Sequence, residues 1–181
     1  MNILETSIPD VVVIQPRVFN DDRGFFFETF NRNQLKKLGI DFAVMQENCA
    51  FSLKKGTIRG LHFQNNPFAQ AKIVRCTSGS VIDYAVDLRK NSPTYLKHVS
   101  VVLTSDNKYQ LYLPKGFAHG VISTADNSMI EYYADNPYNP DYDRSIRFDD
   151  PQINIDWGMT ELILSPKDSN APVLVDSDCN F

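Results

Sequence analysis

Short β-rich runs, separated by glycine, proline, asparagine and aspartate, dominate the sequence. Runs at this spacing, with no helices alternating between them, predict an antiparallel sandwich or barrel and exclude a doubly wound α/β fold. A jelly roll fits the pattern best. The expected strands are Val11–Ile14, Phe25–Phe30, Ala43–Ser52, Thr57–Phe63, Ala71–Thr77, Ser80–Asp87, Val99–Leu103, Tyr109–Leu113, His119–Ser123 and Ser128–Tyr133.

One short helix and an irregular C-terminal segment complete the expected all-β architecture. The helix is predicted around Asn31–Leu38, because Asn31 or Asn33 can cap its start and Gly39 suits its end. From about Asn136 onward the chain is rich in Asp, Asn and Pro and then carries scattered apolar residues. We expect this segment to wrap the sandwich, so that residues 1–181 form one domain.

Composition limits the classes of partner and cofactor. The net charge of −4 argues against a nucleic-acid or anionic membrane surface, which clustered Lys and Arg would hold. Met1–Asp10 has no basic leader and no stretch approaches a membrane span, so a cytoplasmic protein is expected. The three cysteines, at positions 49, 76 and 179, match no disulfide or CxxC pattern and predict free thiols. No HxH pair begins a metal cluster, and no metal is expected.

The run Ile58–Gln64 places a cation, a glycine and an imidazole inside an apolar strand. A buried histidine such as His62 is more often structural than catalytic, but its neighbours favour chemistry. Strict alternation would send Arg59 and His62 to opposite faces of the sheet. A shared site therefore needs a bulge or twist, for which Gly60 is the obvious position.

Four further segments carry candidate residues, each with a plain structural alternative. In the next strand Lys72 is in line with core positions, which indicates an anion or a cavity unless Lys72 protects a sheet edge. His119 is flanked by small residues that let a ligand approach, although a hairpin would explain the glycines. Tyr132 lies in a strand that tyrosine favours anyway. Taken alone, the segment with Lys167 and Asp168 is expected to form a solvated polar loop. No dinucleotide, Walker A or GxSxG motif is present.

Six segments in register along nearly the whole chain resemble the dTDP-4-dehydrorhamnose 3,5-epimerases. Single segments would be weak evidence, but their combination in this order is highly specific. The segments are DDRGFFFETF from Asp21, QENCAFSLKKGTIRGLHFQ from Gln46, QAKIVRC from Gln70, DYAVDLRKNSPT from Asp83, LPKGFAHG from Leu113 and LSPKD from Leu164.

The resemblance implies a cupin-like jelly roll in a homodimer, no metal or organic cofactor, and a nucleotide-sugar substrate. It also implies that His62 is the proton acceptor, Asp168 its carboxylate partner, Tyr132 the proton donor and Lys72 the group near the sugar carbonyl. The substrate-binding positions implied in the same way are Arg23, Phe26, Glu28, Gln46, Asn48, Arg59, His119, Tyr138, Asp143 and Lys167.

The chemistry of the implied reaction agrees with these residue types. Protons on C3 and C5 of a sugar are acidic only because the carbanion spreads onto the C4 ketone oxygen. The enzyme therefore needs a base, a cation or donor at that oxygen, and an acid on the opposite face of the ring. Inversion at both carbons of dTDP-4-dehydro-6-deoxy-D-glucose would give dTDP-4-dehydro-L-rhamnose.

Departures from the family pattern keep alternatives open. Asp143 stands where glutamate is common, Tyr133 where lysine is usual, and Pro137 replaces a tyrosine. The alternatives are an epimerase for C3 or C5 alone that acts on a different nucleotide-linked 4-keto sugar, a sugar-nucleotide 3,4-ketoisomerase, and a sugar-nucleotide-binding protein without catalysis. A metal-dependent cupin oxygenase has little support, because two of its usual histidines have no counterpart.

Overall fold

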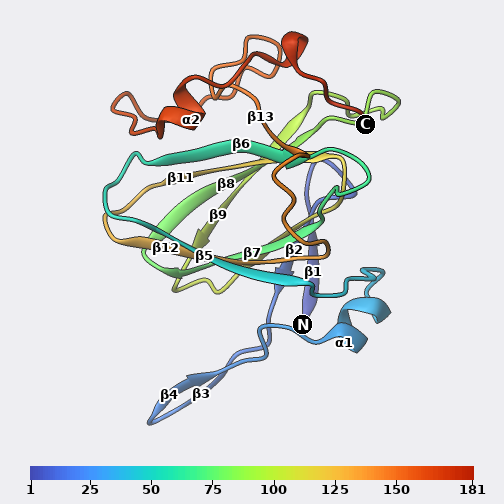
Figure 1. Ribbon diagram of the computed structural model, residues 1–181. Helices are drawn as coiled ribbons and strands as arrows, with labels where there is room; N and C mark the ends of the chain where they lie inside the picture. The colour runs from blue at the N-terminus through green and yellow to red at the C-terminus, as the bar shows by residue number, and fades with distance from the viewer.

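Two antiparallel sheets face each other in the computed structural model, which describes residues 1–181 (Figure 1). The six-stranded sheet has the order β1-β2-β10-β7-β12-β5 and the five-stranded sheet the order β13-β6-β11-β8-β9. The strands of the two sheets are β1 (Asn2–Glu5), β2 (Val12–Gln15), β5 (Gln46–Ser52), β6 (Ile58–Gln64), β7 (Lys72–Ser78), β8 (Ser80–Asp87), β9 (His98–Thr104), β10 (Gln110–Leu113), β11 (Phe117–Ser123), β12 (Ser128–Ala134) and β13 (Asp143–Ser145).

Apolar side chains from both sheets fill the space between them. The largest inner cluster is formed by buried residues that alternate with outward-facing ones along their strands, as in a sandwich. We call this set the inner apolar cluster. It consists of Ile8, Val11, Val13, Val74, Cys76, Val81, Ala85, Val99, Leu103, Leu111, Leu113, Phe117, Val121 and Ile130.

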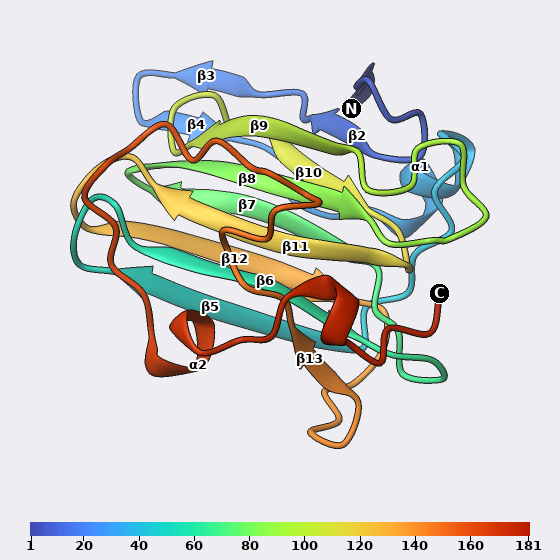
Figure 2. The same cartoon turned by 90° about the horizontal axis from the view of Figure 1, so that it is seen from above.

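The C-terminal segment covers the outer face of the five-stranded sheet. Figure 2 shows this segment, in red, running across that sheet. It contributes Ile153, Trp157 and Leu174 to a second apolar cluster with outward-facing residues of β6, β8 and β11. The segment also contains α2 (Pro166–Ser169), which packs against β6, and the 3-10 helix η1 (Leu174–Asp176). The expected wrapping of the sandwich is confirmed.

A hairpin and a helix lie outside the two sheets. Strands β3 (Phe19–Asp21) and β4 (Gly24–Phe26) pair only with each other and project away from the six-stranded sheet (Figure 1). Helix α1 (Arg32–Lys37) begins after Asn31, whose side chain accepts a hydrogen bond from the backbone of Gln34, so this predicted cap is confirmed. Leu35 is the buried residue of the helix.

Several boundaries differ from the sequence prediction. The prediction of a strand over Phe25–Phe30 was wrong beyond position 26, because β4 ends there and the chain leaves the hairpin and turns toward α1. Strands β1, β3 and β13 were missed, since none of their residues is buried, whereas the short strands β2 and β10 carry buried residues and were predicted. The three cysteines are free, as expected; Cys49 is exposed and the other two are buried. No helix of the structure combines the length and apolar character of a membrane span.

Candidate functional site

His62 and Arg59 lie on the same, inward face of the five-stranded sheet. His62 is opposite His119 and Arg59 opposite Val121, so two residues of β6 stand opposite Gly120 of β11. This register shift, expected at Gly60, is present. Gly60 has a φ of +139°, and a Cβ on it would lie 2.6 Å from Gly120 Cα, so only glycine fits there.

Helix α2 brings a carboxylate to His62 from the far end of the chain. His62 Nε2 lies 2.5 Å from Asp168 Oδ1, and Asp168 is 3% exposed. The prediction of a solvated loop at Leu164–Asp168 was wrong, because Ser165 and Pro166 start a capped helical turn that buries the aspartate. The sequence contains this signal, since a serine followed by Pro and, three residues on, an acidic residue is typical of a helix start.

Hydrogen bonds keep Asp168 ionised in spite of its burial. Burial alone would raise the pKa of Asp168, but hydrogen bonds from His62 and Ser165 and the charges of His62 and Lys167 bring the pKa below its ordinary value. In the neutral imidazole, with Nε2 of His62 donating to this carboxylate, Nδ1 is left with a free lone pair. His62 is therefore held as an oriented base.

A second carboxylate–histidine pair lies beside the first on the same inner face. His119 Nε2 is 2.9 Å from Oδ1 of Asp83, which is fully buried, and Asp83 Oδ2 has no hydrogen-bond partner. Sequence reasoning missed Asp83, although an aspartate inside the apolar run VIDYAV is a signal of a buried partner.

Lys72 and Tyr132 face these histidines from the six-stranded sheet. Lys72 Nζ lies 5.6 Å from the centre of the Tyr132 ring, and that ring lies 6.4 Å from the His119 ring. Burial lowers the pKa of Lys72 to about 8, although Asp83 and Asp143 oppose the shift. We call His62, Asp168, His119, Asp83, Lys72 and Tyr132 the His62 cluster.

The phenol of Tyr132 stays protonated at neutral pH. Burial raises its pKa, the nearby charge of Asp143 raises it further, and Arg59 opposes both. A protonated phenol beside an ammonium group and two imidazoles combines a proton donor, a cation and bases in one place. Such a set can move a proton on and off a carbon acid.

Polar side chains of β5 and β6 extend the inner face around the cluster. Asn48 pairs with Tyr132 across the strands, and Gln46 Nε2 donates to Asn48 Oδ1 at 2.7 Å. Arg59 donates to the carbonyl of Phe51 at 2.6 Å and to Ser52 Oγ at 3.3 Å. Ser52 is a partner that sequence reasoning missed.

An ion pair and a tyrosine lie at the β13 edge of the five-stranded sheet. Asp143 Oδ2 accepts from Lys167 Nζ at 2.5 Å and from the Tyr138 hydroxyl at 3.3 Å. Tyr138 is half exposed, and its backbone N–H donates to Gln46 Oε1 at 2.8 Å. Although shorter than glutamate, Asp143 therefore contacts two other residues that the resemblance assigned to substrate binding, Lys167 and Tyr138.

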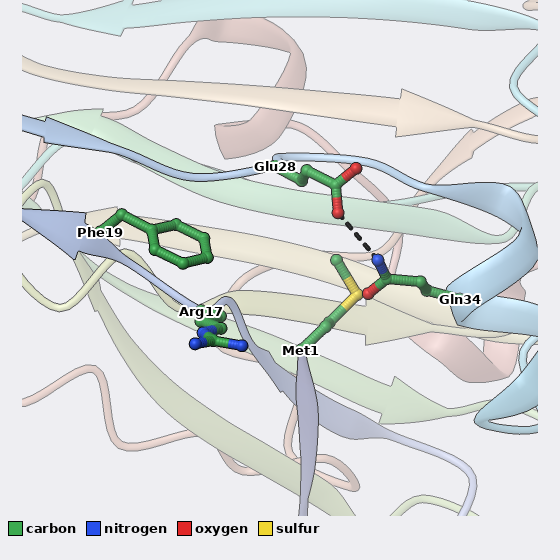
Figure 3. A pocket seen from close by; sticks show the side chains of 5 residues that line it. All are labelled: Met1, Arg17, Phe19, Glu28 and Gln34. Carbon is green, nitrogen blue, oxygen red and sulfur yellow. Dashed lines mark hydrogen bonds between the residues drawn. The ribbon is translucent and has the colours of Figure 1, made fainter.

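Three residues predicted for the site lie away from the His62 cluster. Arg23 and Phe26 are on the projecting hairpin, where Arg23 pairs with Asp21 and Phe26 is 67% exposed. Glu28 accepts from Asn31 and Gln34. Figure 3 shows Glu28 in a separate pocket with Met1, Arg17, Phe19 and Gln34, none of which belongs to the cluster. One copy of the chain thus does not assemble the whole predicted set.

No group of three or more His, Cys, Asp and Glu side chains is arranged to hold a metal ion. The His62 cluster instead contains pairs of one histidine and one carboxylate, each joined by a hydrogen bond.

Comparisons with known proteins agree with one another. A family model described as dTDP-4-dehydrorhamnose 3,5-epimerase matches residues 5–176. The enzyme of that name from Escherichia coli K12 is 49% identical over 170 residues, which cover 93% of this chain and 91% of the relative.

Two solved structures of epimerases are also similar to this chain. An epimerase from Legionella pneumophila in complex with dTDP-4-keto-L-rhamnose is similar with a TM-score of 0.93 and 40% identity, covering 98% of this chain and 94% of its own. A 3'-monoepimerase from Streptomyces bikiniensis in complex with dTDP-quinovose gives a TM-score of 0.87 and 32% identity, covering 94% and 87%.

Proposed function

The chain belongs to the dTDP-4-dehydrorhamnose 3,5-epimerase family and is an isomerase, and we propose the roles that its residues take in the reaction. The proposed substrate is dTDP-4-dehydro-6-deoxy-D-glucose, inverted at C3 and C5 to dTDP-4-dehydro-L-rhamnose. One observation carries the proposal: an oriented base, His62, shares an inner face with His119 and is opposed by Lys72 and Tyr132.

Proton removal is assigned to His62. Its Nδ1 takes the proton from C3 or C5, the C–H electron pair forms a double bond to C4, and the carbonyl electrons move onto oxygen. Asp168 stabilises the imidazolium that results, since its carboxylate accepts from Nε2. Lys72, protonated below its pKa of about 8, stabilises the enolate oxygen.

Reprotonation is assigned to Tyr132. It donates its phenolic proton to the carbon from the side opposite His62, and the enolate electrons return to the carbonyl, which inverts the centre. The raised pKa of Tyr132 supports this role, because the phenol retains its proton until the carbanion forms. Proton exchange with solvent then restores both side chains.

The remaining predicted residues are assigned to substrate binding. Arg59 and His119 lie beside the cluster, and Gln46, Asn48, Asp143, Lys167 and the aromatic Tyr138 lie around it. The nucleotide base is assigned to the Tyr138 end, because this ring is exposed and held by its backbone.

A homodimer is part of the proposal. Arg23, Phe26 and Glu28 lie on or near a hairpin that projects from one copy, and its aromatic rings are exposed. An exposed aromatic surface of this kind supports contact with a second copy of the chain. Light scattering of the purified protein tests this assembly, and a monomer would contradict it. The free thiols further support a reducing compartment such as the cytoplasm.

The test of the reaction is solvent exchange. In heavy water, with the dTDP-linked 4-keto sugar, we expect deuterium at both C3 and C5 of the product by NMR. His62→Ala should abolish exchange, whereas His98→Ala, on the edge strand β9 outside the cluster, should retain it. Label at C3 alone would instead make the chain a monoepimerase like the Streptomyces relative, and exchange in His62→Ala would refute the assigned base. CDP- and GDP-linked 4-keto sugars in parallel test the nucleotide.

A further inference from the structure

The carboxylate of Asp168 is held from two sides. Oδ1 lies against His62 Nε2, and Oδ2 accepts a hydrogen bond from the hydroxyl of Ser165 at 2.9 Å. The same Ser165 oxygen accepts from the backbone N–H of Asp168 at 3.1 Å. Ser165 thus touches both the side chain and the backbone of the residue that orients the base.

Ser165 differs from the other groups that act on Asp168, because it carries no charge. The charged groups facing this carboxylate are His62 on β6 and Lys167 on α2 itself, and Lys167 is paired with Asp143. The interaction with His62 changes each time the imidazole gains or loses a proton. The hydrogen bond from Ser165 persists through both states of the histidine.

We propose that Ser165 is a positioning residue of the proton-transfer reaction, which fixes the Asp168 carboxylate so that one oxygen always faces His62. The inference rests on the proposed function of His62 as the base. Without the hydroxyl, the buried carboxylate would lose one of two side-chain hydrogen bonds and turn about its Cβ–Cγ bond. The imidazole would then lose its fixed orientation toward the substrate.

The structural role of Ser165 as a helix cap must be separated from this role in catalysis. Glycine is tolerated at the N-cap position and removes the hydroxyl, whereas threonine retains both the hydroxyl and the cap. Ser165 is exposed, so the extra methyl group of threonine has room in solvent. Ser169, also exposed, ends the same helix, and its hydroxyl bonds only to the carbonyl of Pro166.

The experiment compares Ser165→Gly, Ser165→Thr and Ser169→Gly in the epimerase assay across pH. For Ser165→Gly we expect kcat to fall roughly tenfold or more with KM little changed, as for a lost hydrogen bond to a charged group. The loss should persist at every pH at which the wild type is active, because the missing hydrogen bond acts on the ionised carboxylate of Asp168, whose pKa lies below its ordinary value. Ser165→Thr and Ser169→Gly should match the wild type.

Two outcomes overturn the proposal. If both glycine variants lose kcat equally, the effect comes from a loosened helix; if Ser165→Gly behaves as wild type, the hydroxyl is not needed. Failure of the proposed function is recognised separately, because the wild-type protein would then show no exchange at C3 or C5. A wild-type enzyme that depends on His62, together with an unaffected Ser165→Gly, would reject the role of Ser165 alone.

Discussion

Replacing Lys72 with methionine should make the protein more stable and inactive at the same time. Lys72 is 8% exposed on the inner face of β7, in line with the apolar residues Val74 and Cys76. Methionine has a similar length and fills the same space without a charge, so no cavity opens. The change therefore removes the cost of burying an ammonium group.

The magnitude follows from the pKa of the lysine. The pKa falls from 10.5 to about 8 in the folded protein, and each pKa unit corresponds to about 1.4 kcal/mol. Below pH 8 the charged lysine thus costs roughly 3 kcal/mol of folding free energy. Between pH 8 and 10.5 the unfolded chain binds more protons than the folded one, so wild-type stability rises with pH there. The advantage of Lys72→Met is greatest below pH 8 and shrinks toward pH 10.5.

Thermal unfolding at pH 7 and pH 9.5 measures this effect. For a chain of this size we expect Lys72→Met to raise Tm by roughly 6–10 °C at pH 7, with a smaller gain at pH 9.5. Lys37→Met, on the exposed face of α1, serves as the control and should leave Tm unchanged. An unchanged or lower Tm for Lys72→Met would refute the reasoning. In the epimerase assay the variant should lose most of kcat, because no cation remains at the enolate oxygen.

Three other substitutions test the carboxylate partner of the base, the proton donor and the bend of β6. Asp168→Asn retains the shape of the side chain but cannot stabilise an imidazolium, so kcat should fall roughly 10²–10⁴-fold in the product assay. Tyr132→Phe removes the acid and leaves the base, so NMR of the recovered substrate should show solvent deuterium without inversion; full loss of exchange would contradict the assignment. Gly60→Ala forces a Cβ against Gly120 and should lower the unfolding free energy by roughly 2–4 kcal/mol in urea titrations. Gly24→Ala, at φ +127° in open space, is its control and should cost less.

Long strands were predictable because each carries a repeated signal. Alternation along Lys72–Cys76 correctly placed Lys72, Val74 and Cys76 on one face, and the glycine that interrupts Ile58–Gln64 correctly marked the register shift. Short strands were predictable only where they carry buried residues, as β2 and β10 do. Strand β3 was missed and β4 was only partly predicted, because every residue of this hairpin is exposed and it pairs with nothing else in the chain.

Pairing between distant residues was the least predictable part of the site. His62 and Asp168 are 106 positions apart, and only the family resemblance linked them before the structure brought Nε2 and Oδ1 within 2.5 Å. His119 and Asp83 had no such link, because a buried aspartate could pair with any cation. Local pattern therefore located the candidate residues, while the packing of α2 against β6 and the pairing of β11 with β8 decided which of them meet.

The apolar half of the space between the sheets is the inner apolar cluster, which alone includes residues of β2, β9 and β10. It meets the His62 cluster on β7, β8, β11 and β12, where Tyr132 packs against it. Substitutions away from that contact should have effects opposite to those in the His62 cluster. Leu111→Ala, fully buried on β10, removes apolar contacts and should cost roughly 2–5 kcal/mol of unfolding free energy. Its kcat, measured well below its lowered Tm, should remain that of the wild type, whereas Lys72→Met gains stability and loses kcat. A large loss of kcat in Leu111→Ala would show that the apolar half also sets the geometry of the reacting groups.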